Sequence, residues 1–554
     1  MLAARLGRGW LIGMALVAAI GRLSPAPAQG LRGDQVEALR QALISEKDRS
    51  SRGVELTSKV AALKSMNDLH RALFLAEWRD HHPDPEVAIV DQKYRALVGK
   101  RFEQTIRPVL KSTDKALCMR SLEQLDAVAT AQPEGCDPCK FMPALAGDLA
   151  DLTRHGSTGV REMAAKVLGR WHADPEVAVP ALGTLLVVGA LSERVTAAGS
   201  LTQVIEEAYR LANQDNAKMD KAAARRNLIL SARGAIPALA RGIKDKEPEV
   251  RHLSLVGMTA IGRCCHGLVQ AWDLTETDEN PDKTRTQLEK NFAELLPLIL
   301  QLGDQCKILP FALGDPELEI RLDALQVIEE TATLRLEWAR RAQGVSVPED
   351  PLRDSLNVDL PALARNLGDH QVTIRRKTLE VLELMGSAAR ASAPNVVRSL
   401  NDPDPFVRWA AARTLGKFAP AESATAIPGL IKLLNETDTG IRMTAVTSLE
   451  RYGPAAKHAV PALVIKTRAE DAEMRACGIR ALAAIAADSQ TVAGCVQDAL
   501  KDPVELVRQS AREAAARLRQ AAQETGGMLS FHKPPVEPND STKTKDPLLQ
   551  GKKP

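Results

Sequence analysis

The stretch Leu360–Leu382, LPALARNLGDHQVTIRRKTLEVL, aligns without gaps with three later stretches, which begin at Ala393, Ile427 and Val460. Each has a Pro at its second position, then a polar turn, then an apolar residue followed by Arg. These anchor arginines recur every 33 or 34 residues, at Arg375, Arg408, Arg442, Arg475 and Arg508. A fixed period of this length is the signature of a repeat array.

Each repeat is predicted to hold two helices. A Pro in the first turn of the first helix costs little, because its missing N–H would be unpaired there anyway. The second helix has apolar residues at i, i+4 and i+8, as in Val407, Ala411 and Leu415. The middle one is small in every copy, which allows close packing: Ala164, Ala197, Ser254, Ala324, Thr378, Ala411, Ala445, Gly478 and Ala511. The fold class predicted is an all-α solenoid of stacked antiparallel helix pairs.

An acidic residue lies six positions before the anchor arginine in most copies. The pairs are Asp245/Arg251, Asp315/Arg321, Asp369/Arg375, Asp402/Arg408, Glu436/Arg442 and Asp502/Arg508. In the turn between the helices, the acid can cap the second helix or accept from the arginine of a neighbouring repeat, which would form a ladder of charge-assisted bonds. The alternative is a set of unrelated surface pairs worth ~0–1 kcal/mol each. The ladder is expected to be weaker where His155, Val188 and Ala469 replace the acid.

The pattern Pro-x-Leu, Leu-x-Asp, Val-Arg, Ala, Leu at this period resembles the HEAT family, and most of all its shorter PBS-lyase HEAT-like repeats. The resemblance covers about residues 140–520. It implies a general binding scaffold, because the fold supports many functions.

Two enzyme types share this resemblance. Deoxyhypusine hydroxylase binds two irons through His-Glu dipeptides, but none of the ten His here precedes Glu. The bilin-attaching lyases that gave the repeats their name offer no short motif to match. The prediction is therefore no metal and no cofactor.

The N-terminus has the layout of a secretory signal peptide. Arg5 and Arg8 precede an apolar run from Trp10 to Ile20, and Ala26-Pro27-Ala28 suits cleavage after Ala28. Retention as a membrane anchor is the alternative. Cleavage removes three arginines and brings the formal charge of +3 to zero, so we expect no nucleic-acid partner and no integral membrane segment. The expected location is periplasmic or secreted.

The chain divides into six predicted segments. They are a signal peptide (1–28), a helical cap or divergent repeats (29–135), HEAT-like repeats (136–265), an insert with an acidic loop (266–303), further repeats with a loop insert near 342–357 (304–520), and a disordered tail (521–554). Three intervals between anchor arginines are longer than one repeat. Their extra residues lie near 212–232, 266–303 and 337–357. The last two inserts are expected to protrude as loops.

The eight cysteines allow three interpretations. Cys136 and Cys139 form a C-x-x-C, and Cys264-Cys265-His266 ends a second helix. Disulfides or structural thiols, a metal site and a redox pair all remain open.

Function is predicted from the exposed positions of the second helices. The sequence has no phosphate-binding glycine loop, dinucleotide fingerprint or nucleophile elbow, so we expect a protein-interaction scaffold and no enzyme. The candidate partner-binding residues on the concave wall are Trp409, Arg413, Arg376, Glu380, Met443 and Arg480. Trp409 beside Arg413 is the strongest pair, because Trp and Arg dominate interface energetics. The alternative is an extracytoplasmic enzyme or enzyme subunit of the HEAT-like lyase type.

Overall fold

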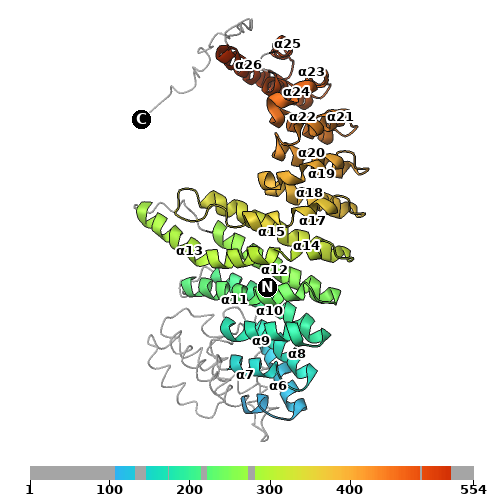
Figure 1. Cartoon of the computed structure of the whole chain (residues 1–554). Coiled ribbons are helices and arrows are strands. Elements are labelled where there is room, and N and C mark those ends of the chain that lie inside the picture. Colours follow the sequence, from blue (N-terminus) through green and yellow to red (C-terminus); the bar gives the residue numbers. More distant parts are fainter. Residues whose placement is uncertain are drawn as a thin grey trace, which may run out of the picture. The chain divides into compact units, whose positions relative to one another are not determined.

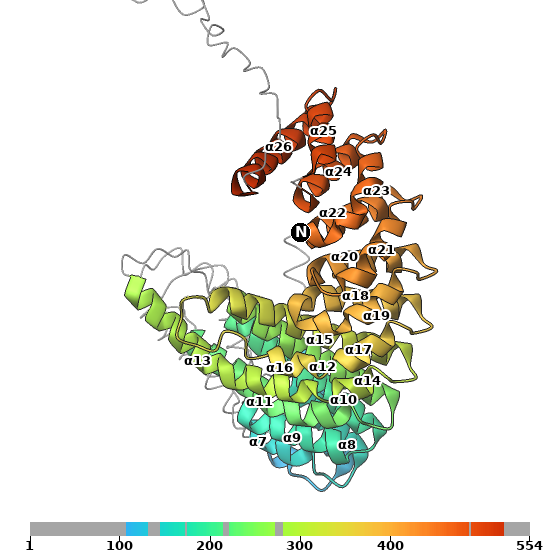
Figure 2. The same ribbon diagram turned by 45° about the horizontal axis from the view of Figure 1, so that its top comes forward.

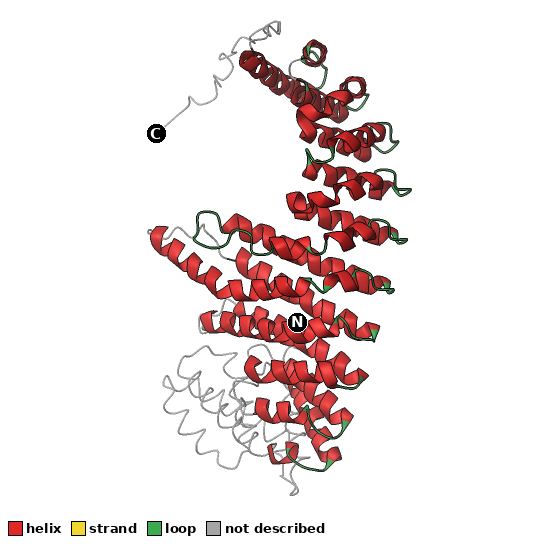
Figure 3. Ribbon diagram, viewed as in Figure 1, coloured by secondary structure: helices red, strands yellow, loops and turns green. Residues whose placement is uncertain are grey.

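The computed structural model describes residues 107–130, 145–171, 174–213, 221–271, 281–486 and 489–525. Every regular element in these ranges is helical and none is a strand (Figure 3), so the all-α prediction is confirmed. The signal segment, most of the predicted cap, the Cys136/Cys139 motif and most of the acidic loop lie outside the described residues. The helices form two compact units, divided between Met385 and Gly386.

The first unit has two layers of helices (Figure 1). The first helices of the pairs are α7 (Leu145–Leu152), α9 (Pro175–Val188), α11 (Lys221–Gly242), α13 (Pro281–Cys306), α14 (Leu309–Ala312), α16 (Arg353–Asn357) and α17 (Leu360–Asn366). The second helices contact one another in the order α6 (Lys115–Thr130), α8 (Thr158–Arg170), α10 (Leu191–Ala212), α12 (Pro248–Gln270), α15 (Leu318–Arg341) and α18 (Val372–Met385).

The second unit repeats this plan with shorter helices (Figure 2). Its first helices are α19 (Ala393–Ser399), α21 (Ser423–Leu433), α23 (Val460–Lys466) and α25 (Gln490–Ala499). Its second helices are α20 (Pro405–Phe418), α22 (Thr439–Tyr452), α24 (Ala472–Ile485) and α26 (Glu505–Thr525). The 3₁₀ segments η2 (Gly386–Ser392) and η3 (Gly453–Ala459) lead into α19 and α23.

The core is built from the predicted apolar face and its small middle residues. Val407, Ala411 and Leu415 are fully buried, and all nine small middle residues are buried. The close approach is visible at Gly242, where an added Cβ would lie 2.1 Å from the Ser254 Oγ. The small residues therefore let the helices pack at contact distance.

The extra residues between anchors mostly lengthen helices, which corrects the expectation of protruding loops. Residues 281–303 of the predicted insert belong to α13, which has 26 residues. The reason is an apolar stripe at helical spacing, and its Phe292 packs edge-on against Trp338 at 4.5 Å between ring centroids. In α11 and α21 the helix begins earlier than predicted, so Pro237 and Pro428 lie inside it.

Two boundaries also shift. The insert near 342–357 is irregular over residues 342–352 and then forms α16. It packs onto α15, because the Trp338 Nε1 donates to the Pro348 carbonyl at 2.7 Å and Arg335 pairs with Asp350 at 2.6 Å. Helix α26 extends to Thr525, so residues 521–525 of the predicted tail are helical. No helix in the described ranges is long and apolar enough to cross a membrane.

Candidate functional site

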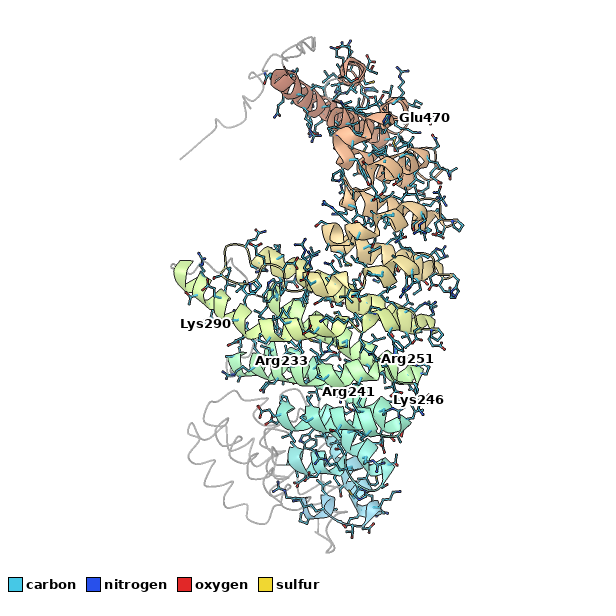
Figure 4. All side chains as sticks on the ribbon, viewed as in Figure 1. Arg233, Arg241, Lys246, Arg251, Lys290 and Glu470 are labelled. Carbon is cyan, nitrogen blue, oxygen red and sulfur yellow. The ribbon has the colours of Figure 1, made fainter. Side chains whose placement is uncertain are left out.

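The anchor arginines join neighbouring repeats. Arg251, labelled beside Lys246 in Figure 4, donates through Nη1 to the carbonyls of Asp245 and Lys246, both at 3.0 Å. Its Nη2 donates to Asp315 Oδ1 at 3.0 Å, and its Nε lies 2.8 Å from Asp315 Oδ2. One guanidinium therefore binds the turn of its own repeat through Nη1 and pairs with the acid of the next repeat through Nη2 and Nε.

The same arrangement recurs along both units. The rungs between neighbouring repeats are Arg194–Asp245, Arg251–Asp315, Arg321–Asp369, Arg408–Glu436 and Arg475–Asp502. Arg375 and Arg508 also donate to the carbonyls of Asp369 and Asp502, at 2.9 and 2.6 Å.

The aspartates of the ladder have a second role. One carboxylate oxygen accepts the backbone N–H two residues later, as from Glu317 to Asp315 and from Asp404 to Asp402. The bond orders the turn that leads into the second helix. The two roles predicted as alternatives, capping and pairing, are therefore combined in one side chain.

Two departures from the ladder behave differently. Where Val188 replaces the acid, Arg161 pairs with Glu193 at 2.7 Å, so the expected weakness is wrong at this rung. Glu193 is fully buried and also accepts from the Ala190 N–H at 2.8 Å. It was missed because it immediately precedes the anchor Arg194, although a Glu at the third position of a helix is a capping signal.

Where Ala469 replaces the acid, Arg442 has no carboxylate partner among the described residues. It donates to the carbonyls of Glu436 and Thr437, at 2.8 and 2.6 Å, and to Thr439 Oγ1 at 2.7 Å. In the copy with His155, the ring Nδ1 accepts from the Ser157 N–H at 3.0 Å and so takes over the turn bond.

The structure brings Trp409 and Arg413 together on α20. The Arg413 guanidinium carbon lies 4.4 Å from the Trp409 ring centroid, and both side chains are half-exposed. Phe406, which was not predicted, is 64% exposed and lies three residues before Trp409. The spacing of Phe406, Trp409 and Arg413 puts them on one face of the helix, a signal that could have found Phe406.

The other predicted residues are more dispersed. Met443 is half-buried on α22. Arg480 on α24 donates to Ser510 Oγ at 3.3 Å and Cys477 Sγ at 3.0 Å, so it contributes to packing. Arg376 and Glu380 lie 3.6 Å apart on α18 of the first unit.

The described cysteines are free thiols, buried except for half-buried Cys495. Burial raises the pKa of Cys264 to about 12 and raises the pKa of Cys265 and Cys306 as well. These thiols are therefore protonated and behave as small apolar groups. The described residues contain no group of three or more His, Cys, Asp or Glu arranged to hold a metal.

A buried carboxyl lies at the start of α17. Asp359 is fully buried, and neither of its carboxylate oxygens has a hydrogen-bond partner in the described structure. Burial raises the pKa of Asp359 to about 8, because the charged form loses its water.

A family model for HEAT repeats matches residues 360–450 and 427–516. The chain carries HEAT repeats over residues 360–516. These HEAT repeats include the Trp409–Arg413 pair and the rungs from Arg408 and Arg475. No curated protein matches the chain.

Solved structures with a similar fold include importin beta, at 15% identity and a TM-score of 0.40 over 92% of this chain. Another is the karyopherin Kap121p, also solved bound to the extreme C-terminus of the protein phosphatase Cdc14p, at 14% identity and a TM-score of 0.32 over 89% of this chain. This chain spans 61% of the importin beta chain and 57% of Kap121p.

Proposed function

We propose that this HEAT-repeat chain is a non-enzymatic scaffold that binds another protein on the exposed face of its second helices. The observation that carries the proposal is the Trp409–Arg413 pair, with the guanidinium stacked on a half-exposed indole. Trp and Arg are the residue types most enriched where binding energy concentrates, and a stacked cation is already oriented for a partner.

The neighbourhood of this pair supports preorganised binding. Asp404 caps α20 by accepting the Val407 N–H at 3.0 Å, and the Arg408–Glu436 rung at 2.9 Å ties the helix to the next repeat. A side chain on a fixed helix loses less conformational entropy when it binds. Phe406 lies on the same face of α20 as Trp409 and Arg413 and adds exposed apolar area to it.

We also propose that the protein is exported and acts in the periplasm or outside the cell. The support is the basic, apolar and small-residue order of residues 1–28. N-terminal sequencing of the mature protein should begin at Gln29. A mature chain that begins before Trp10 would contradict export by cleavage.

The binding proposal is tested by the double variant Trp409→Ala/Arg413→Glu in a quantitative pull-down from envelope extracts. A matched control is Ile465→Ala/Arg468→Glu, which changes an exposed apolar residue and an exposed arginine on the first-helix side of the same unit. The capture of the specific partner should fall by about tenfold or more for the first variant, since losing a hot spot costs roughly 2 kcal/mol. Equal capture by both variants, with unchanged helical content, would overturn the assignment of this surface.

A further inference from the structure

Helix α11 of the first unit is basic along its whole length. It carries five basic side chains and no acidic one over 22 residues, at Lys221, Arg225, Arg226, Arg233 and Arg241. This is unusual in a chain whose 73 basic residues nearly balance its 70 acidic residues. The helix belongs to the first-helix layer of the first unit, whereas Trp409 lies on a second helix of the second unit.

Three arginines lie on the exposed side of this helix, Arg226, Arg233 and Arg241, and the exposed Lys244 follows in the turn after it. We call these four cations the α11 row. The first three are seven and eight residues apart, which is close to whole turns and keeps them on one face. At 1.5 Å per residue, they lie roughly 10 and 12 Å apart along the axis. Figure 4 labels Arg233 and Arg241 along α11.

The cations of the α11 row have no carboxylate partner in the described part of the chain. By contrast, the anchor arginines are bound in rungs, as in Arg251–Asp315, and other exposed arginines pair within their helix, as in Arg340–Glu337. Unneutralised guanidinium groups repel one another, and an anion between them would relieve that repulsion. Among the described residues, the charge of the α11 row therefore does not contribute to the fold through ion pairs.

The positive surface is only one helix wide. Helix α13 lies beside α11, since Gln301 donates to the Arg233 carbonyl at 3.0 Å. It exposes Glu294 and Asp304, and Asp304 pairs with Lys307 at 2.8 Å. An anionic membrane is planar and would meet these acids, so a narrow linear anion fits the charge distribution better.

Apolar side chains accompany the row. Leu230 lies between Arg226 and Arg233 and is 43% exposed, and Leu300 on the adjacent α13 is 47% exposed. A polypeptide ligand offers both kinds of contact, because it carries carboxylates and apolar groups on one chain.

We propose that the α11 row binds an extended acidic segment of a protein, with a carboxylate at about every third residue. A segment in the extended polyproline II conformation advances about 3.1 Å per residue and has three residues per turn. Every third carboxylate therefore lies on one face, about 9 Å from the next, which is close to the spacing of Arg226 and Arg233. Each guanidinium can receive a carboxylate through two parallel N–H···O bonds. Leu230 and Leu300 contact apolar side chains between the acids.

The test is a fluorescence-anisotropy titration of the full chain with a labelled 15-residue peptide that has Glu at every third position and Gly and Ser between. The variant Arg226→Gln/Arg233→Gln/Arg241→Gln should weaken peptide binding by roughly tenfold or more. The control Arg365→Gln/Arg451→Gln/Arg468→Gln removes the same charge from exposed arginines elsewhere in the chain and should bind as the parent does.

A second variant tests the same site in case the first variant fails to fold. Leu230→Glu places one negative charge within the row and should weaken the peptide severalfold by repulsion. Equal loss in the control, or no measurable peptide binding by the parent, would overturn the proposal. Tighter binding of a 20-nucleotide oligo-dT, or of vesicles with 30% phosphatidylserine, would also overturn it in favour of a nucleic acid or a membrane.

Discussion

The rung Arg251–Asp315 of the first unit is buried more deeply than the rung Arg408–Glu436 of the second. The side chains of Arg251 and Asp315 are 9% and 3% exposed, whereas those of Arg408 and Glu436 are 18% and 23% exposed. Asp315 also accepts a turn N–H, which Glu436 does not do in the described structure. The same sequence pattern thus produces a buried rung at Arg251–Asp315 and a semi-exposed pair at Arg408–Glu436.

The helices that carry these two rungs also differ in length. Helices α12 and α15 have 23 and 24 residues, compared with 14 in α20 and α22. Charges in a less hydrated setting interact more strongly, but they also cost more when a partner is removed. The following variants test whether burial, rather than the spacing in sequence, decides what a rung contributes.

The largest effect is expected for Asp315→Ala. It leaves the Arg251 guanidinium buried without its carboxylate and removes the turn bond, so the free energy of unfolding should fall by about 3–5 kcal/mol. Urea unfolding followed by circular dichroism measures the change. The control Asp315→Asn keeps an oxygen for the Glu317 N–H and should lose less. Equal losses would show that the turn bond contributes nothing, and losses well below about 3 kcal/mol in both variants would contradict a stabilising buried ion pair.

The buried Asp359 of the first unit gives a pH-dependent effect. Its folded pKa of about 8 lies above the ordinary value of about 3.9, so the folded state keeps a proton that the unfolded state releases. Stability should therefore decrease as the pH rises from about 4 to about 8, by up to about 1.4 kcal/mol per pH unit, and level off above.

Asp359→Asn should remove this part of the pH dependence, and it should stabilise the protein more at pH 8 than at pH 5. Melting temperatures across that range provide the measurement. The exposed Asp354→Asn in the same segment serves as the control. Parallel pH profiles for the parent and Asp359→Asn would contradict a neutral buried carboxyl.

The smallest effect is expected for Ala469→Glu in the second unit. Position 469 corresponds to Glu436 of the preceding repeat, so a carboxylate there can complete the rung from Arg442. Because this site is half-exposed, the gain in unfolding free energy should be only about 0.5 kcal/mol, and it should shrink in high salt. Ala469→Gln is the uncharged control, and a gain of the same size for it would remove the ionic explanation.

Much of the fold could be predicted from residue types at fixed spacing. Three features recur in the repeats and reflect their shared local geometry. They are the period of the anchor arginines, the small middle residues and the acid before an anchor such as Arg251. The lengthened α13 was missed because its extra residues were treated as an insertion, although Phe292 and its neighbours have helical spacing. Asp359 was missed for another reason, since its burial depends on contacts between repeats that no local pattern reports.

The candidate site was predicted less completely than the fold. Helical spacing correctly placed Trp409 over Arg413, because residues four apart lie on one face. The same spacing could not predict that Arg480 donates to Ser510 of the next repeat, because this contact depends on the packing of α24 against α26.

A pair of double-mutant cycles tests most directly whether burial sets the strength of the ladder. One cycle combines Arg251→Met with Asp315→Ala, and the other combines Arg408→Met with Glu436→Ala, each followed by urea unfolding. We predict a coupling energy of about 2 kcal/mol or more for Arg251–Asp315 and about 0.5 kcal/mol for Arg408–Glu436. Equal coupling energies, or a larger one for Arg408–Glu436, would contradict this account.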